Sequence, residues 1–350
     1  MIQKTIKILL AYNQPTGGIY SNYDGKRIGK EEFSKQIDLS EVGVIEEYET
    51  IRDLLNSKGF YLESFNLLDN VTELIKKIHE TNYDVVFNLV ESVGGDSMKE
   101  MYVAGIFELM NVPYTGCSAV TLGLCLDKHR AKLIIKGAGY NVPEWKLFET
   151  PNKIIFDSKP KFPLIVKPSR EDASVGISEQ SIVYNEKELA EQVEFLYSSL
   201  RQPIIAEEFI DGREINSAIL GDKNKIALPL SEIDFSTLPY ELPKIVTYEG
   251  KWIKHSTYYK HTIPICPAPL DEVMSSKLKS LALEITTIFG CRDYARVDFR
   301  LAKNDIPYVL EVNPNPDISI DAGFARAAEA YGISYDELLL TIIQVALERK

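Results

Sequence analysis

The first third of the chain alternates short apolar strands with amphipathic helices, and this alternation constrains the fold more than any other feature. The strands are predicted over residues 7–11, 61–65 and 85–90, and the helices over 39–58, 71–79 and 98–110. The first helical stretch repeats apolar residues at helical spacing and ends at Gly59. Consecutive strand and helix units of this kind predict an α/β region, with a parallel sheet and helices on both faces.

The remainder of the chain has a different pattern, which predicts α+β structure. The expected helices cover 127–136, 186–200, 271–289, 321–331 and 335–349, and the expected strands cover 162–168, 204–209, 214–220, 295–301 and 308–312. Segment 231–270 is rich in Pro, Tyr, His and Thr with weak periodicity, and a loop of that length is usually functional or mobile. At roughly 150 residues per domain, a chain of 350 residues suggests two or three domains.

The composition excludes several classes of protein. The 39 Lys and Arg against 51 Asp and Glu give a net charge of −12, which argues against general nucleic-acid binding because that binding depends on an excess of cations. A local basic pocket for one phosphorylated ligand stays compatible with this charge. No run approaches the ~20 apolar residues that span a bilayer, and the apolar core of residues 7–11 is too short for a signal peptide.

The spacing of cysteine and histidine argues against a disulfide scaffold and against a zinc site. The four cysteines have no Cys-x-x-Cys spacing, and the four histidines form no His-x-x-x-His pair. We therefore expect a protein of the reducing cytoplasm.

Polar residues of two expected strands near the C-terminus alternate in a way that predicts a metal site. Arg296 and Asp298 lie two residues apart and so share one face of their strand, and Glu311 and Asn313 do the same on the partner strand. Mg²⁺ prefers oxygen ligands, commonly one or two carboxylates together with nucleotide phosphates. A solvated polar face of the sheet is the alternative. Confinement of the polar residues to one face favours the site, since the intervening residues form an apolar set made of Val297, Phe299, Leu310 and Val312.

Three further segments carry residues suited to a nucleotide. Lys128 begins a helix, and Lys167 ends an apolar strand that is followed by a short turn over 170–176, whose backbone N–H groups could face phosphates. The segment from Glu207 to Glu214 joins an apolar strand end, a tight turn and an acid that could hold an adenine ring and ribose hydroxyls. Taken alone, an ordinary turn and an ordinary hairpin explain these segments about as well.

Together, the order and spacing of these segments resemble the ATP-grasp superfamily, and within it the D-alanine–D-alanine ligase branch. The resemblance runs from about Asn111 to the C-terminus, while the first 90 residues match only a generic βα domain. It is carried by Pro113-Tyr-Thr-Gly116, Leu126-Asp-Lys128, Phe162-Pro-Leu-Ile-Val-Lys-Pro-Ser-Arg-Glu171, Ser174-Val-Gly176, Glu207-Glu-Phe-Ile210, Gly212-Arg-Glu214, Cys266-Pro-Ala268, Ala295-Arg-Val-Asp-Phe299 and Glu311-Val-Asn313.

The resemblance implies a role for each matched residue. Lys128 and Lys167 would hold the nucleotide phosphates, and Glu214 would bind the ribose. The adenine pocket would be lined by Glu207, Phe209 and Ile210. The metal ligands for two Mg²⁺ ions, or Mn²⁺ in their place, would be Asp298, Glu311 and Asn313.

The implied catalytic residues are Arg296, Lys251 and Ser174. Arg296 would steady the oxygens of the acyl phosphate and the tetrahedral intermediate, since a donor on a rigid strand is preorganised for developing charge. Lys251 lies in Tyr248-Glu-Gly-Lys-Trp252, which matches the mobile loop of the family, and would reach the γ-phosphate when the loop closes. Ser174 belongs to the small turn.

The resemblance also implies an organisation and a reaction. It predicts a three-domain ATP-grasp fold, with an N-terminal doubly wound βα domain (1–124), a small central domain (125–207) and a C-terminal domain with the metal site and the mobile loop (208–350). A carboxylate would be converted by ATP into an acyl phosphate, and an amine would then attack to form an amide. The partners would be these two small molecules, with a homodimer as the expected assembly.

The departures from the family fall on the substrate side of the site. True D-alanine–D-alanine ligases carry an acid after a Gly-Gly pair beyond the first strand, and residues 12–19 here contain none. That acid normally bonds to a serine, which is Ala173 here, and to a tyrosine, which is Trp252. Three members of one hydrogen-bonded set are thus replaced together, which is less costly than leaving one of them without partners.

Two more differences concern the second substrate. The family glycine that lends an N–H to the oxyanion matches Asp317, and the serine that holds the second carboxylate matches Ala322. Glu91 and Asp96 lie where the family has other residues, and they are candidates to meet a substrate amine or ordinary helix-capping acids. We therefore expect a ligase that keeps the ATP chemistry and joins other substrates. A D-alanine–D-alanine ligase with a rebuilt site and a non-catalytic ATP-binding module are the alternatives.

Overall fold

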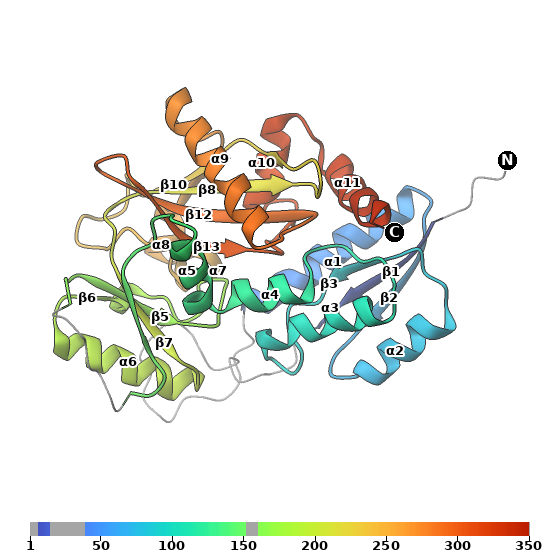
Figure 1. The fold of residues 1–350 in the computed structure, drawn as a ribbon, viewed down its shortest axis with the longest axis horizontal. Coiled ribbons are helices and arrows are strands. Elements are labelled where there is room, and N and C mark those ends of the chain that lie inside the picture. The colour runs from blue at the N-terminus through green and yellow to red at the C-terminus, as the bar shows by residue number, and fades with distance from the viewer. Residues whose placement is uncertain (1–5, 15–38, 152–159, 350) are drawn as a thin grey trace.

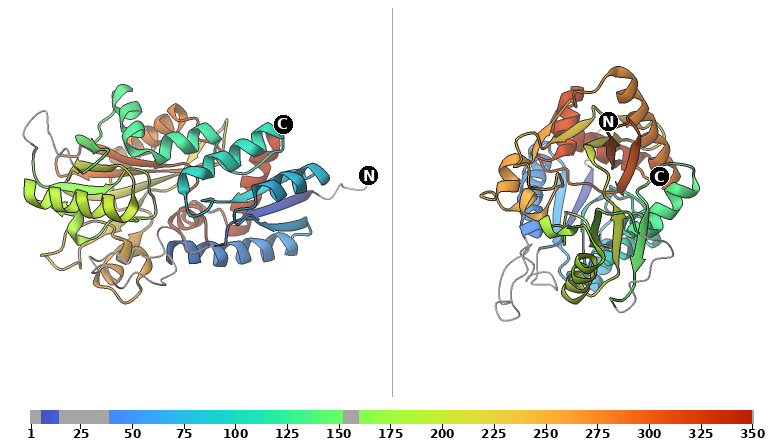
Figure 2. Two further views of the ribbon diagram at one scale, coloured as in Figure 1. Left: turned by 90° about the horizontal axis from the view of Figure 1, so that it is seen from below. Right: turned by 90° about the vertical axis from the view of Figure 1, so that its left-hand side faces the viewer.

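The computed structural model describes residues 6–14, 39–151 and 160–349. In these residues the strands form three separate sheets, one in each successive part of the chain. Figures 1 and 2 show the N-terminal sheet at one end of the molecule, and the central and C-terminal sheets packed together at the other.

The N-terminal sheet is parallel, with strand order β2-β1-β3, as the alternation of strands and helices predicts. Its elements are β1 (Lys7–Tyr12), α1 (Leu39–Ser57), β2 (Tyr61–Asn66), α2 (Val71–Glu80), β3 (Val85–Leu89), a short 3₁₀ turn η1 (Ser97–Lys99) and α3 (Glu100–Leu109). Ile8 and Leu10 belong to a core that includes α1, whereas Leu9 and Ala11 point to the opposite core with α2 and α3. Because both faces are covered, β1 and β3 are mostly apolar and buried, whereas the edge strand β2 is partly exposed.

The central sheet has the order β4-β7-β5-β6 and is antiparallel. It is preceded by α4 (Ala119–Leu126) and α5 (Lys128–Gly137), and it comprises β4 (Trp145–Phe148), β5 (Leu164–Pro168), η2 (Glu179–Ser181), β6 (Ile182–Val183), α6 (Glu186–Leu200) and β7 (Ile204–Glu208). The apolar side chains of α6, such as Leu189 and Leu196, pack with Val166 and Ile204 of the sheet. Asn185 caps α6 by accepting a hydrogen bond from the Glu188 N–H at 3.0 Å.

The C-terminal sheet has the order β11-β10-β8-β12-β13, with β9 paired to β8. Its strands are β8 (Gly212–Leu220), β9 (Ile226–Ala227), β10 (Ser231–Asp234), β11 (Ile263–Ile265), β12 (Tyr294–Ala302) and β13 (Pro307–Asn313), and its helices are α7 (Tyr248–Trp252), α8 (Thr257–His261), α9 (Glu272–Ile288), α10 (Gly323–Tyr331) and α11 (Tyr335–Glu348). Ile215, Val297 and Phe299 form a core with Leu278 and Ile285 of α9. The alternate residues of β8 and β12 therefore point to the other face, which carries the candidate site.

Several elements differ from the sequence-based expectation, among them the unpredicted short strands β4, β6 and β9. The sequence pattern does not predict helix α4, because its residues are apolar on nearly all sides and give no helical period; Ser118 caps it. Segment 231–270 contains β10, α7, α8 and β11, although its periodicity is weak. Short elements of three to five residues cannot show a period, so they escape this kind of analysis.

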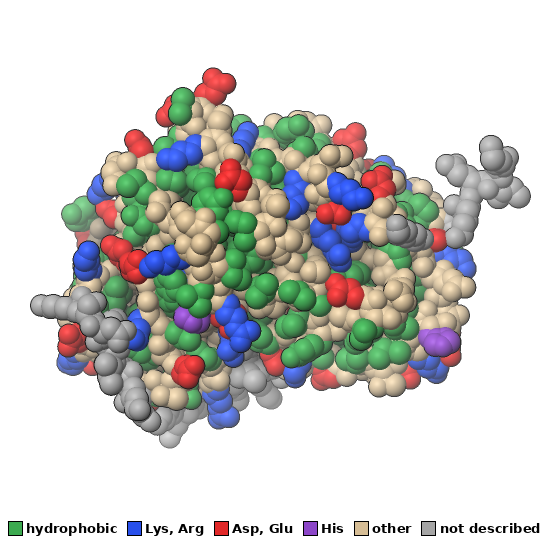
Figure 3. All heavy atoms as spheres, viewed as in Figure 1, with side chains coloured by type: hydrophobic (Ala, Val, Ile, Leu, Met, Phe, Trp, Pro, Cys, Tyr) green, Lys and Arg blue, Asp and Glu red, His purple; other side chains and the backbone are tan. Residues whose placement is uncertain are grey.

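The last helix returns to the beginning of the fold. Leu338 and Ile342 of α11 share a core with Ile8 and Phe87 of the N-terminal sheet, and Figure 1 shows α11 beside α1. Among the described residues, none of the helices is both long and apolar enough to cross a membrane. On the face shown in Figure 3, acidic and basic side chains are interspersed.

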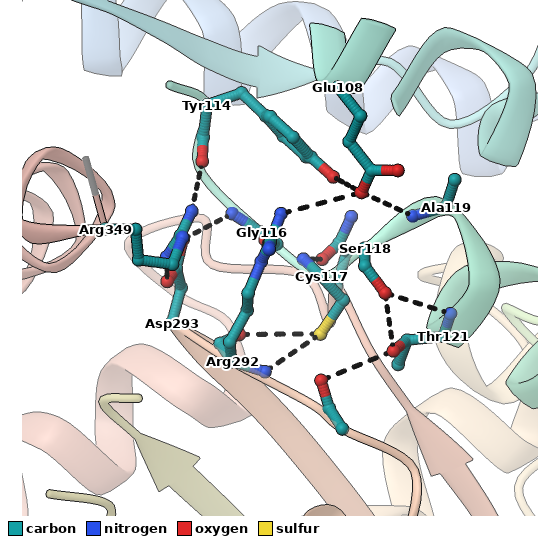
Figure 4. Close-up of polar contacts among 12 residues, drawn as sticks. Glu108, Tyr114, Gly116, Cys117, Ser118, Ala119, Thr121, Arg292, Asp293 and Arg349 are labelled. Carbon is teal, nitrogen blue, oxygen red and sulfur yellow. Dashed lines mark hydrogen bonds and ion pairs between the residues drawn. The ribbon is translucent and has the colours of Figure 1, made fainter. Parts of the chain in front are cut away.

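A buried ion pair holds the N-terminal and C-terminal parts together (Figure 4). Asp293, just before β12, is fully buried and accepts hydrogen bonds from the Gly116 N–H at 2.7 Å and from Arg349 Nη1. Arg349 Nη2 also donates to the Tyr114 carbonyl, and Arg292 Nε donates to the Gly116 carbonyl at 3.1 Å. Burial raises the pKa of Asp293 to about 6, although the charge of Arg349 opposes this shift.

Replacement of Arg349 by Ala should destabilise the protein in a pH-dependent way. Removing one partner of a buried ion pair costs about 3–5 kcal/mol, since the other charge stays buried. Above its raised pKa, Asp293 is ionised and needs the cation, whereas at lower pH the protonated carboxyl does not. Urea unfolding should therefore show a larger loss of unfolding free energy at pH 8 than at pH 5.

The matched control is Lys58→Ala. It removes an exposed ion pair with Asp336, a residue of α11, the helix that Arg349 follows. An exposed pair contributes about 0–1 kcal/mol, so this variant should stay near the wild type at both pH values. Equal losses for Arg349→Ala at pH 5 and pH 8 would contradict the role given to Asp293.

Candidate functional site

The two C-terminal strands form the predicted antiparallel pair and bring the proposed metal ligands together. Asp298 lies opposite Glu311, and Arg296 lies opposite Asn313. Opposite residues in an antiparallel pair point to the same face. The face opposite α9 is thus polar, as the alternation predicts.

Asp298 is the centre of the hydrogen bonds on this face. Arg296 donates to it twice, from Nε to Oδ1 at 2.7 Å and from Nη2 to Oδ2 at 2.9 Å. Asn216 Nδ2 donates to Oδ1 at 2.7 Å, and Asn313 Nδ2 donates to Oδ2 at 3.0 Å. Sequence reasoning missed Asn216, since only the pairing of β8 with β12 places it opposite Asp298.

The expected apolar set is wrong at one position. The register shifts by one residue between Asp298 and Phe299, so Phe299 pairs with Val309. Val309 is buried, whereas Leu310 is only partly buried. This irregularity allows Glu311 to stay opposite Asp298 while Val309 points to the core, because a bulge adds one residue to one strand.

Lys128, the first residue of α5, points from that helix to strand β13. Its Nζ lies 3.4 Å from Glu311 Oε2 and donates to the Glu171 carbonyl. The side chain is buried. Asp127 caps the helix by accepting from the Arg130 N–H at 3.1 Å, and it also forms an ion pair with Arg170 at 3.2 Å. These contacts fix both the start of α5 and the turn after β5.

Lys167 and Glu207 are neighbours on the central sheet, and a second lysine joins them. Lys167 Nζ lies 3.1 Å from Glu207 Oε1, and Lys132 Nζ lies 3.2 Å from Glu207 Oε2. Lys132 and Glu207 are each only 1% exposed. Burial, against the attraction of Glu207, lowers the pKa of Lys132 to about 8. Sequence reasoning missed Lys132; its signal is a lysine among the inward positions of α5 next to Ala131 and Ile135.

Four cations act on Glu311. Burial alone would raise the pKa of this carboxyl, but the charges of Lys128, Lys167, Arg296 and Lys251 together bring the pKa well below its usual range. Lys128 forms an ion pair with Glu311, whereas Lys167 pairs with Glu207 and Arg296 pairs with Asp298. The site can hold an anion and a divalent cation side by side.

The metal-binding residues fit a hard cation. Two carboxylates on facing strands, Asp298 and Glu311, with the amide of Asn313 beside them, supply the oxygen ligands that Mg²⁺ prefers when phosphates complete its shell. The described residues contain no group of three His, Cys, Asp or Glu arranged to hold a metal alone.

Lys251 lies on the short helix α7, which is docked on the turn after β5. The Trp252 indole Nε1 donates to the Ala173 carbonyl at 3.1 Å, and the Tyr248 N–H donates to the Ile177 carbonyl at 2.9 Å. Lys251 is exposed. The structure thus brings together Ala173 and Trp252, through a backbone acceptor instead of a serine hydroxyl.

The turn itself has an uncommon backbone. Ala173 and Ser174 both have positive φ angles, 49° and 62°. Such angles cost side-chain-bearing residues free energy, and they persist where the surroundings hold them in place. Trp252 and Tyr248 supply such contacts from α7.

The expected ribose and adenine residues lie at the end of the same polar face. Glu214 forms an ion pair with Arg300 at 3.2 Å, and the Arg300 guanidinium lies over the Phe209 ring at 5.7 Å from its centre. Burial raises the pKa of Glu214, while Arg300 opposes this shift. Ile210 follows Phe209 and is partly buried.

The residues expected on the substrate side lie in several different segments. Asp96 caps η1 by accepting from the Met98 N–H at 3.1 Å, which supports its interpretation as a capping acid. Asp317 accepts from the Ser319 N–H at 2.8 Å, and Ala322 is the residue before α10. Glu91 is exposed. In the stretch without an acid, only 12–14 belong to the described residues, and 15–19 lie outside them.

Known proteins with this arrangement identify the family. The family model described as D-ala D-ala ligase C-terminus matches residues 134–344, more than half of the chain. The D-alanine–D-alanine ligase of Carboxydothermus hydrogenoformans is 32% identical over 302 residues, which cover 84% of this chain and 90% of that protein. The chain belongs to the D-alanine–D-alanine ligase family. It is therefore an ATP-dependent ligase, as the resemblance implies.

Other relatives extend the comparison. The uncharacterized protein y4sG of Sinorhizobium fredii is 32% identical over 265 residues, covering 76% of this chain and 75% of that protein. The crystal structure of D-alanine–D-alanine ligase from Bacillus anthracis complexed with ATP superposes with a TM-score of 0.72 at 23% identity, over 99% of this chain and 98% of that one. This likeness confirms the predicted ATP-grasp fold.

Replacement of Trp252 by Phe should loosen helix α7. Phe keeps an aromatic ring but lacks the indole N–H, so the 3.1 Å bond to Ala173 is lost. One hydrogen bond contributes about 0.5–1.5 kcal/mol, which corresponds to a severalfold faster exchange of backbone amides. Hydrogen exchange measured by mass spectrometry should rise in residues 248–253.

The control is Trp145→Phe, which removes the indole bond to His129 Nδ1 at 2.9 Å elsewhere in the molecule. It should leave exchange in 248–253 unchanged. Exchange in α7 that is the same in both variants would show that Ala173 does not anchor the helix.

Proposed function

We propose that this protein joins a carboxylate to an amine through an acyl phosphate formed with ATP, and that at least one of the two substrates differs from D-alanine. The observation that carries the reaction is the set of ion pairs Lys128–Glu311, Lys167–Glu207 and Arg296–Asp298, with the charge of Lys251 also acting on Glu311. A carboxylate and an amine do not condense in water by themselves, because the leaving group is poor. Transfer of a phosphoryl group supplies a better one, and it requires cations around the transferred oxygens.

Each residue has a part in this proposal. Lys128 and Lys167 bind the nucleotide phosphates, and Lys251 neutralises charge on the transferring group from α7. Arg296 is held by Asp298 on a rigid strand and stabilises the developing oxyanion. Bound Mg²⁺, which we infer as two ions held by Asp298, Glu311 and Asn313, would supply Lewis-acid stabilisation of the phosphates.

Exclusion of water falls to α7 and the turn beneath it. An acyl phosphate hydrolyses if water reaches it, so a segment must cover the site during the reaction. Trp252 and Tyr248 dock α7 on the turn that carries Ser174. We place Ser174 among the catalytic residues because this turn lies directly under the segment that bears Lys251.

The adenosine part of ATP is assigned to the far end of the same face. Phe209 and Ile210 follow β7 and would line the adenine pocket together with the backbone at Glu207. Glu214 would accept from the ribose hydroxyls, with Arg300 keeping its carboxylate in place. The division into parts 1–124, 125–207 and 208–350, and a homodimeric assembly, belong to the same proposal.

The substrate side supports a different acid or amine. The indole of Trp252 bonded to the Ala173 backbone replaces a hydroxyl-bearing pair by a more apolar surface. Ala322 cannot hold a carboxylate with its methyl group. These positions are where the first and the second D-alanine would bind in the family.

Carboxylates border this part of the site and are suited to a substrate amine. Burial, and then the charges of Asp317 and Glu91, raise the pKa of Glu47. Burial, and then the charges of Asp172 and Glu91, raise the pKa of Glu100. An ammonium group placed among these acids would favour their ionised forms and be stabilised by them, and we assign Glu91 as its first contact because it is exposed.

Phosphate release from Mg-ATP tests the reaction and the substrate together. With D-alanine as the only amino acid, we expect release far below that of an ordinary D-alanine–D-alanine ligase measured in parallel. A panel of amino acids, small acids and amines should contain a pair that restores release. Release with D-alanine at the parallel enzyme's rate would instead establish the genuine D-alanine–D-alanine ligase, which the named relatives favour. Failure of every acid and amine to bind would support the non-catalytic module.

Replacement of Lys167 by Ala should abolish nucleotide binding. Lys167 is buried at the end of β5, and its ammonium would make charge-assisted hydrogen bonds to phosphate, each contributing about 1.5–3 kcal/mol. Calorimetric titration with Mg-ADP should show this loss. The control is Lys161→Ala, an exposed lysine just before the same strand. An ADP affinity equal to that of the wild type would remove Lys167 from the phosphate site.

A further inference from the structure

Lys132 is a buried lysine that the nucleotide assignment does not use. It lies on the inner side of α5 with 1% of its surface exposed. Its Nζ is 3.2 Å from Glu207 Oε2 on the central sheet and donates to the Leu310 carbonyl of β13 at 3.2 Å. A lysine so deeply buried is rare unless it is paired, and this one contacts two different sheets.

Glu207 is shared between two lysines. Lys167 lies 3.1 Å from one carboxylate oxygen and Lys132 lies 3.2 Å from the other. The carboxylate is 1% exposed, so water cannot stabilise its charge. A buried charge without a partner is costly, and therefore at least one of the two ammonium groups must stay with Glu207.

We propose that Lys132 is a positioning residue for nucleotide binding: it neutralises Glu207 so that Lys167 can leave that carboxylate and bind a phosphate. This inference rests on the proposed function, in which Lys167 holds the nucleotide. Without Lys132, the ammonium of Lys167 would be retained by Glu207, and phosphate binding would have to offset the cost of an unpaired buried carboxylate.

The contact with Leu310 gives Lys132 a second effect on the same site. Leu310 is the partly buried residue at the register shift, directly before Glu311. By bonding its carbonyl, Lys132 ties α5 to the strand position that sets the direction of Glu311. The residue therefore connects the phosphate-binding side of the central sheet with the metal-binding strand, while it touches neither ligand itself.

Calorimetric titration with Mg-ADP at pH 7 tests this role through the variant Lys132→Met, which keeps an unbranched side chain, one heavy atom shorter, and removes its charge. We expect ADP affinity to fall about 10- to 100-fold, the equivalent of one charge-assisted hydrogen bond. Adenosine, which has no phosphate, should lose far less affinity than ADP. The control Lys136→Met, one turn along the same helix, removes an exposed lysine paired with Glu144 and should bind ADP as the wild type does.

The background Glu207→Gln separates positioning from a merely structural role. When residue 207 is neutral, Lys167 has no carboxylate to retain it, so Lys132→Met should change ADP affinity by less than about threefold. If Lys132→Met alone does not fold, the double variant, which has no unpaired buried carboxylate, is compared with Glu207→Gln alone, and a loss of ADP affinity above about threefold there would overturn the inference.

Two outcomes would overturn the inference. One is a folded Lys132→Met that binds ADP as the wild type does. The other is a loss of affinity of equal size whether Lys132→Met is made in the wild-type chain or in the Glu207→Gln background. A wild-type protein that binds no Mg-ADP would instead refute the proposed function, so the two failures are distinguishable.

Discussion

The balance of charge around Glu311 is the constraint on which the site depends. Its carboxylate is surrounded by four cations from α5, β5, α7 and β12, and their charges overcome the effect of burial on its pKa. The buried cations need counter-charges: Lys128 pairs with Glu311, Arg296 with Asp298 and Lys167 with Glu207. In the proposed function, the carboxylates would face Mg²⁺ and the cations would face the nucleotide phosphates.

Arg296 and Asp298 are kept in place because their strand, β12, is anchored both by packing on α9 and by contacts at its start. Strand β12 packs its apolar residues on α9 and presents Arg296 and Asp298 on the other face. Just before that strand, Asp293 is tied to the segment after α3 and to the end of α11 (Figure 4). Strand β12 is therefore held by the N-terminal part of the molecule as well as by its own sheet.

Much of the fold and of the candidate site can be inferred from the sequence. The strand and helix alternation predicts the parallel N-terminal sheet, and the polar and apolar alternation in 295–313 predicts the metal-binding face. The failures have physical causes. Alternation alone assigns Leu310 to the apolar set, because a bulge leaves no mark in a two-residue period. Helix α4 escapes prediction because its residues are apolar on nearly all sides. Lys132 and Asn216 escape it because each contacts the site only through strands or helices distant in sequence.

The sequence by itself determined the class of chemistry, because the lysines, the arginine and the metal-binding carboxylates occur in recognisable order and each belongs to a local pattern. Only the tertiary structure decided how their charges are shared. In the folded chain, Glu207 lies between Lys132 and Lys167. The Trp252 indole donates a hydrogen bond to the backbone carbonyl of Ala173. Local patterns report which face of an element a side chain occupies, whereas the partner it meets depends on how separate elements pack. Pairing of buried charges is a property of that packing, and so it could be seen only in the folded molecule.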